Sequence, residues 1–153
     1  MRNLKAWINF MRSMNRENSM ANGKKIIIVE DDSDINNFIA YNLAKAGFVV
    51  EQIFDGVSAM QRIKEEVFNI VILDIMLPGI DGFDICKEIK NDSRYSRSFI
   101  VVVSAKCHEQ DKLYAHLLGA DCYLTKPFNL TSLLSAVNEI SDSLDREYLV
   151  KKG

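Results

Sequence analysis

The chain has 153 residues, enough for one domain with a sizeable core and too few for two ordinary domains. Hydrophobic residues make up 48% of it, and 19 basic and 21 acidic residues leave a net charge of -2. This composition excludes disorder as the default state, and it argues against direct nucleic-acid binding, which requires a clustered basic surface.

The first 22 residues are polar and basic and contain no strand-like run. They lack the continuous apolar block of a signal peptide. Some apolar residues recur there at helical spacing, which would suit a small amphipathic anchor for a membrane or a partner: Leu4, Trp7, Ile8 and Met11. We favour a flexible extension, or sequence upstream of the true start at Met20. No stretch is long and apolar enough to span a bilayer, so we expect no stable membrane insertion.

From Lys24 onward, short apolar runs rich in β-branched residues alternate with segments of helical spacing. The runs cover residues 26–29, 49–54, 70–73, 100–103 and 122–124. Most are continuous rather than alternating, as strands buried on both faces require. Strands and helices that alternate in this way imply right-handed crossovers and a parallel sheet with helices on both faces, which is a doubly wound α/β fold.

Two of the helical segments have recognisable ends. The first follows the opening strand, carries apolar residues from Ile35 to Ala46 and stops at Gly47, a residue type favoured just past a helix C-terminus. The last carries apolar residues from Leu130 to Leu144, with Asn129 as a candidate N-cap and Phe128 as a candidate staple.

Polar residues follow four of the predicted strands at the point where each strand ends. Glu30 and Asp31 follow the first strand, Asp74 the third, Ser104 the fourth and Lys126 the fifth. Because the carboxyl ends of parallel strands meet at one crevice, we expect these side chains to converge. The sequence therefore predicts three carboxylates, one hydroxyl and one ammonium in a single place.

Such a cluster suits phosphoryl chemistry. Neighbouring carboxylates raise one another's pKa unless a cation intervenes, and carboxylate oxygens are ligands that Mg²⁺ prefers. A carboxylate can also attack phosphorus to give an acyl phosphate, while a metal, an ammonium and a hydroxyl stabilise the transferred group. We interpret Asp74 as the nucleophile, with Lys126 and Ser104 in supporting positions.

Four motifs resemble the receiver domain of two-component response regulators, in the same order and spacing. They are IIIVEDD at 26–32, VILDIMLPGIDG at 71–82, VVVSA at 101–105 and GADCYLTKPF at 119–128. The resemblance implies a receiver domain over residues 24–145, followed by a short tail at 146–153. It also implies a flavodoxin-like sheet of five parallel strands in the order 2-1-3-4-5.

The resemblance implies a role for each matching residue. Asp74 would accept a phosphoryl group from a histidine kinase. Asp31 would bind Mg²⁺ directly and Glu30 through water, with Asp74 and the Met76 backbone carbonyl as further ligands. Lys126 would pair with a phosphoryl oxygen.

The resemblance also implies a switch. Ser104, in place of the commoner Thr, would move to hydrogen-bond another phosphoryl oxygen, and Tyr123 would turn inward behind it. The Lys126–Pro127 peptide bond would be cis, an isomer that proline makes accessible.

Several of these residues also have an ordinary structural interpretation. Asp32 is best read as a cap of the following helix, with Ser33 as the alternative, and Ser104 would also serve as an N-cap. Tyr123 would also fit as a core aromatic residue. His108 and His116 are read as surface residues, since no acidic partners accompany them.

We therefore predict a single-domain response regulator that signals by phosphorylation-dependent protein binding and is not an enzyme in its own right. The alternative is a phosphorelay shuttle that passes phosphate to another histidine. An aspartate-nucleophile phosphatase is weaker, because the second aspartate that it needs would fall at Met76. A flavodoxin-type nucleotide site is weaker too, because acidic residues 30–32 would repel phosphate. A receiver-like module that works without phosphate is also weaker, because it would lack part of the acidic set, and here the set is complete.

The expected partners are a histidine kinase and a downstream target or phosphotransfer protein. Three cysteines fit no metal spacing, and an odd count without a secretion signal favours a reducing, cytoplasmic location.

Overall fold

The computed structural model describes Lys5 and residues 23–152. The predicted N-terminal extension, residues 1–22, otherwise lies outside the described residues, so its amphipathic pattern stays a prediction. The strands are β1 (Lys25–Val29), β2 (Val49–Ile53), β3 (Ile70–Leu73), β4 (Phe99–Ser104) and β5 (Cys122–Thr125). The helices are α2 (Ser33–Lys45), α3 (Gly56–Glu65), α4 (Gly82–Asn91), α5 (Glu109–Leu117) and α6 (Leu130–Lys152), with a 3-10 turn at Ser93–Tyr95.

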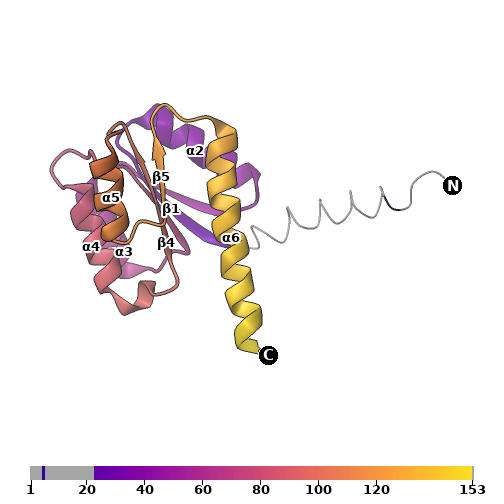
Figure 1. Ribbon diagram of the computed structural model, residues 1–153. Coiled ribbons are helices and arrows are strands. Elements are labelled where there is room, and N and C mark those ends of the chain that lie inside the picture. The colour runs from indigo at the N-terminus through magenta and orange to yellow at the C-terminus, as the bar shows by residue number, and fades with distance from the viewer. Residues whose placement is uncertain (1–4, 6–22, 153) are drawn as a thin grey trace.

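The five strands form one parallel sheet in the order β2-β1-β3-β4-β5, which confirms the predicted fold (Figure 1). Because all neighbouring strands are parallel, each connection from one strand to the next is a crossover, and helices α2 to α5 supply these connections.

Alternate residues of each central strand face opposite sides of the sheet and build two separate cores. Ile26 and Ile28 of β1 pack with α2 and α6, whereas Ile27 and Val29 pack with α3, α4 and α5. Both sets are fully buried, and this is why the apolar runs in the sequence are continuous. The two helical layers hold the strands so that all five carboxyl ends open on one edge.

The predicted helix ends are largely confirmed. Asp32 caps α2, because its carboxylate accepts hydrogen bonds from the backbone N–H groups of Asp34 and Ile35 at 2.9 and 3.1 Å. Gly47 follows that helix with a φ of 98°, the left-handed conformation that favours glycine. Asn129 accepts from the backbone N–H of Ser132 at 2.8 Å, as an N-cap does.

Helix α6 is longer than the apolar pattern predicted. It continues past Leu144 through the segment expected to be a tail and runs to Lys152, so that its last turns extend beyond the sheet (Figure 1). The pattern ends early because residues 146–151 are exposed and no longer need an apolar face. No helix in the described part of the chain is long and apolar enough to cross a membrane.

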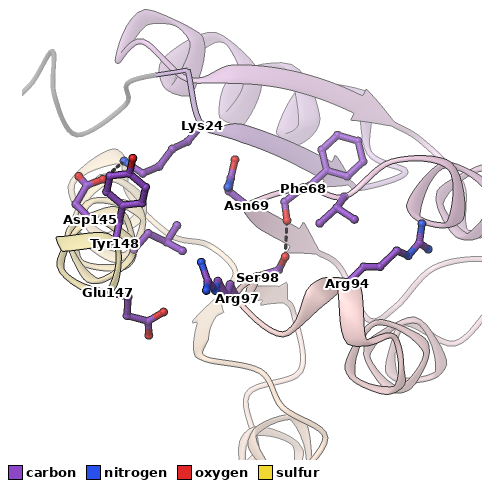
Figure 2. Close-up of a pocket in the computed structure, with 11 residues that line it drawn as sticks. Lys24, Phe68, Asn69, Arg94, Arg97, Ser98, Asp145, Glu147 and Tyr148 are labelled. Atoms are coloured by element: carbon purple, nitrogen blue, oxygen red, sulfur yellow. Dashed lines mark hydrogen bonds and ion pairs between the residues drawn. The ribbon is translucent and has the colours of Figure 1, made fainter. Parts of the chain in front are cut away.

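The amino-terminal edge of the sheet contains a pocket of about 340 Å³, which Figure 2 shows. Lys24 reaches across it to Asp145 of α6, with 2.9 Å between the ammonium and a carboxylate oxygen. Ser98, at its floor, donates its hydroxyl to the Phe68 carbonyl at 2.6 Å. The ion pair joins the start of β1 to α6, at the end of the sheet opposite to the predicted site.

The three cysteines should differ sharply in reactivity. Burial raises the pKa of the fully buried Cys86 to about 12 and also raises the pKa of the half-buried Cys122, whereas Cys107 is exposed. The thiolate is the reactive form, so a thiol reagent should modify Cys107 first in the folded protein and Cys86 only after unfolding. Mass spectrometry of peptides after brief alkylation, with and without urea, checks this order, and early labelling of Cys86 would contradict the packing of α4.

Candidate functional site

The predicted site residues converge at the carboxyl edge of the sheet. Glu30, Asp31 and Asp74 each offer a carboxylate oxygen, and these oxygens all lie within 4.8 Å of one another. Glu30 and Asp74 are only 2% and 5% exposed, whereas Asp31 is exposed. Strands β1 and β3 are neighbours, so the residues that follow them meet directly. The cluster is open to solvent on the Asp31 side.

Lys126 provides the cation of the cluster. Its ammonium donates to a Glu30 carboxylate oxygen at 2.6 Å and to an Asp74 carboxylate oxygen at 2.8 Å. The side chain is 16% exposed, and its backbone N–H donates to the Ser104 carbonyl at 2.8 Å, which joins the ends of β5 and β4. The Lys126–Pro127 peptide bond is cis, as expected.

Asp74 is held by the backbone around it. Its own N–H donates to the Val29 carbonyl at 2.9 Å, and one of its carboxylate oxygens accepts from the Met76 N–H at 2.8 Å. The first residue of α4, Gly82, lies against the same loop: a Cβ there would come within 2.3 Å of the Ile75 Cα and 2.7 Å of the Asp74 carbonyl oxygen. Only glycine permits this close approach, so α4 and the loop that carries Asp74 are locked together.

Burial and neighbouring charges shift the pKa of Glu30 and of Lys126. Burial, with a further contribution from the charge of Asp74, raises the pKa of Glu30 to about 6, although hydrogen bonds from Lys126 and from the Asp32 N–H oppose the shift. For Lys126, burial lowers the pKa, but hydrogen bonds to Asp74 and Glu30 outweigh it, so the pKa is raised overall. The ammonium therefore stays charged at neutral pH and offsets part of the acidic charge.

Ser104 and Tyr123 lie at the rim of the cluster, on β4 and β5. Ser104 is fully buried, and its hydroxyl oxygen accepts from the Lys106 N–H at 3.2 Å. Tyr123 is half-buried and donates its hydroxyl to the Lys106 carbonyl at 2.7 Å. Burial raises the pKa of Tyr123, so the phenol remains a donor at neutral pH. Both residues thus contact one residue of the β4–α5 loop.

The donor set fits a divalent cation. Three carboxylates face a single ammonium, which leaves the cluster with excess negative charge, and hard oxygen ligands on an open rim suit Mg²⁺, an ion that keeps several waters. Glu30, Asp31 and Asp74 are the side chains that would hold it. The Met76 carbonyl stays a predicted ligand.

One prediction about this edge was wrong. Ser104 does not cap the next helix, because α5 begins at Glu109, after a loop, and the capping position is held by His108 without a side-chain bond. His108 and His116 are both exposed, as expected.

Sequence reasoning missed Asn36, a buried residue of α2. Its side-chain amide donates to the Glu30 carbonyl at 2.9 Å. The sequence did contain one signal, because Asn36 is a polar residue within the apolar face of the predicted helix, directly after Ile35. That pattern does not indicate which carbonyl the Asn36 side chain contacts.

Comparisons with known proteins agree with this geometry. The sequence pattern of the response regulator receiver domain matches residues 26–138. Among solved structures, the BeF3-activated receiver domain of DrrB is 30% identical, with a TM-score of 0.72 over 78% of this chain and 98% of that one. A CheY-like receiver domain protein from Methanospirillum hungatei is 27% identical, with a TM-score of 0.75 over 82% and 98% of the two chains. A chemotaxis protein from Vibrio cholerae is also 27% identical, with a TM-score of 0.72 over 77% and 98%.

Replacing Gly82 should disturb the loop that carries Asp74. The added Cβ of Gly82→Ala would overlap backbone atoms that cannot rotate away, so we expect a loss of stability of about 1–3 kcal/mol. Urea unfolding measures this loss. Asp84→Ala, an exposed change in the same helix, serves as the control and should have little effect. Equal stability of the two variants would show that α4 does not lie tightly against this loop.

The raised pKa of Glu30 should make stability depend on pH in the absence of metal. Between its ordinary pKa of 4.5 and the folded value of about 6, the folded protein binds more protons than the unfolded chain. The contribution of Glu30 to the free energy of unfolding is therefore complete below about pH 4.5. This contribution is lost as the pH rises through about 6, which lowers the free energy of unfolding by about 2 kcal/mol. Urea unfolding in a chelator should show this decline in the wild type relative to Glu30→Gln, and parallel curves for the two proteins would contradict the shift.

Proposed function

The chain belongs to the response regulator receiver domain family, and we propose that it accepts a phosphoryl group on Asp74 in a Mg²⁺-dependent reaction and signals by binding a partner protein. The observation that carries the proposal is the placement of the Lys126 ammonium, 2.8 Å from Asp74 and 2.6 Å from Glu30. A buried carboxylate that faces a cation and sits beside two other carboxylates has the charge environment that phosphoryl transfer requires.

Asp74 is the nucleophile in this proposal. A carboxylate oxygen attacks the phosphorus of a phosphohistidine, an O–P bond forms, and the N–P bond breaks with its electron pair returning to the imidazole of the donor. The product is an acyl phosphate on Asp74 and a free histidine on the kinase. The Met76 N–H holds one carboxylate oxygen in place, so the carboxylate is oriented before the donor arrives.

Lys126 and Ser104 stabilise the transferred group. The Lys126 ammonium, already in contact with Asp74, stays close to the charge that develops on the phosphoryl oxygens. The Ser104 hydroxyl lies at the end of the neighbouring strand β4 and supplies a second donor when it moves toward the new group. Bound Mg²⁺ would neutralise negative charge shared by the carboxylates and the phosphoryl oxygens.

The movement of Ser104 also changes the surface that a partner protein binds. Ser104 accepts from the Lys106 N–H and Tyr123 donates to the Lys106 carbonyl, so a change at Ser104 reaches Tyr123 through a single residue. We assign Ser104 and Tyr123 as the switch and the surface of α5, β5 and α6 as the face that changes. Leu113 and Leu117, one turn apart on α5, are exposed there and would contact a partner.

The partners follow from this chemistry. A histidine kinase supplies the phosphoryl group, and a downstream protein or a phosphotransfer protein reads the altered face. This cycle belongs to the cytoplasm, where ATP charges the kinase.

The acceptor can be tested directly. Incubation with acetyl phosphate and Mg²⁺ should add one phosphoryl group to the wild type and none to Asp74→Asn, because the amide is not a nucleophile. Intact-mass spectrometry at short times measures the addition. Asp81→Asn makes the same chemical change in the same loop but retains a capping side chain for α4, so it should be labelled like the wild type. Full labelling of Asp74→Asn would place the acceptor at another residue.

A further inference from the structure

Asn36 is a fully buried polar residue in the first turn of α2. It is 0% exposed, and the other buried residues of that helix are apolar: Ile39, Ala40 and Leu43. Burying an amide costs free energy unless its donors and acceptor are satisfied. An apolar residue would fill this position without that cost, so the contacts of Asn36 need an explanation.

The amide of Asn36 is fully used. Its nitrogen donates to the Glu30 carbonyl at 2.9 Å and to the Ile53 carbonyl at 3.0 Å, and its oxygen accepts from the Gln52 amide at 3.0 Å. Gln52 also donates to Asn37, at 2.8 Å, so its own amide is held from two sides. Because Gln52 offers a donor, it fixes which end of the Asn36 amide faces the two carbonyls.

The Glu30 carbonyl has no strand partner. Strand β1 ends at Val29, and the last contact with β2 is the bond from the Glu30 N–H to the Ile53 carbonyl at 3.1 Å. Beyond this bond, the peptide group that links Glu30 to Asp31 is held by Asn36. That peptide group connects two of the three carboxylates of the acidic cluster, so its rotation would move one relative to the other.

We propose that Asn36 is a positioning residue for the metal site. It holds the Glu30–Asp31 peptide group so that both carboxylates stay directed at the position that Mg²⁺ would take, and Gln52 keeps the Asn36 amide in the donating orientation. The inference rests on the proposed function, because it concerns the same Mg²⁺ site. Residues that orient metal ligands from outside are known to change metal affinity by 10–100-fold when they are removed.

Direct binding of Mg²⁺ to the unphosphorylated protein tests the proposal. Isothermal titration calorimetry should show Mg²⁺ affinity at least about 10-fold weaker for Asn36→Ala and for Asn36→Leu than for the wild type. Asn36→Leu keeps a side chain of similar size and adds no charge near the metal site, but it removes the amide that donates to the two carbonyls. Gln52→Leu leaves the Asn36 amide in place but frees it to turn, so its loss of affinity should be smaller.

Two control variants separate positioning from general stability. Ile39→Val removes a buried methyl group from the same helix and should lower the unfolding midpoint without changing Mg²⁺ affinity. Asn42→Ala removes the same kind of amide from α2, one that donates at 2.8 Å to the Phe38 carbonyl within the helix, and should leave affinity unchanged.

Each outcome decides between the two proposals. If Asn36→Ala binds Mg²⁺ as tightly as the wild type and is only less stable, Asn36 is a core residue and the inference is overturned, while the proposed function stands. If the wild type itself binds no Mg²⁺, the metal site of the proposed function fails together with the inference. If Asn36→Ala does not fold, Gln52→Leu carries the test, and wild-type affinity in that variant overturns the proposal.

Discussion

The structure around the site depends on one partly buried ammonium placed between two buried carboxylates. Lys126 comes from the end of β5, and the carboxylates of Glu30 and Asp74 come from the ends of β1 and β3. None of the three groups would be stable there as an isolated charge, since desolvation of an unpaired ion costs several kcal/mol. The contact therefore joins the ends of three strands. The charged pocket forms only when β1, β3 and β5 have assembled correctly in the sheet.

The sequence predicted the architecture well because the physical signals were local. Continuous apolar runs identified the buried strands, and Asp32 and Gly47 marked the ends of α2. The convergence of Glu30, Asp74 and Lys126 followed from their positions after strands, because parallel strands leave little choice about where their carboxyl ends point. The order of the strands was implied by the resemblance of the motifs, and the sheet has that order.

The remaining features could not be predicted because they depend on contacts distant in the sequence. Asn36 is sixteen residues from Gln52, and nothing in a helical pattern indicates that a polar residue faces the end of a neighbouring strand. Ser104 was predicted to cap the next helix, but the loop up to His108 separates it from α5. The apolar pattern underestimated the length of α6. Exposed helical turns require residues with high helix propensity, but they do not require an apolar periodicity.

The division of the strands between two cores limits how this protein can change by insertion and deletion. In β3, Ile70 and Ile72 belong to one core and Val71 and Leu73 to the other, and Asp74 follows at once. Adding or losing one codon within this strand would exchange the two sets and move the carboxylate out of line with its neighbours. Length variation among descendants of this gene should therefore concentrate in the loops at the amino-terminal edge, where the pocket beside Lys24 leaves room for it.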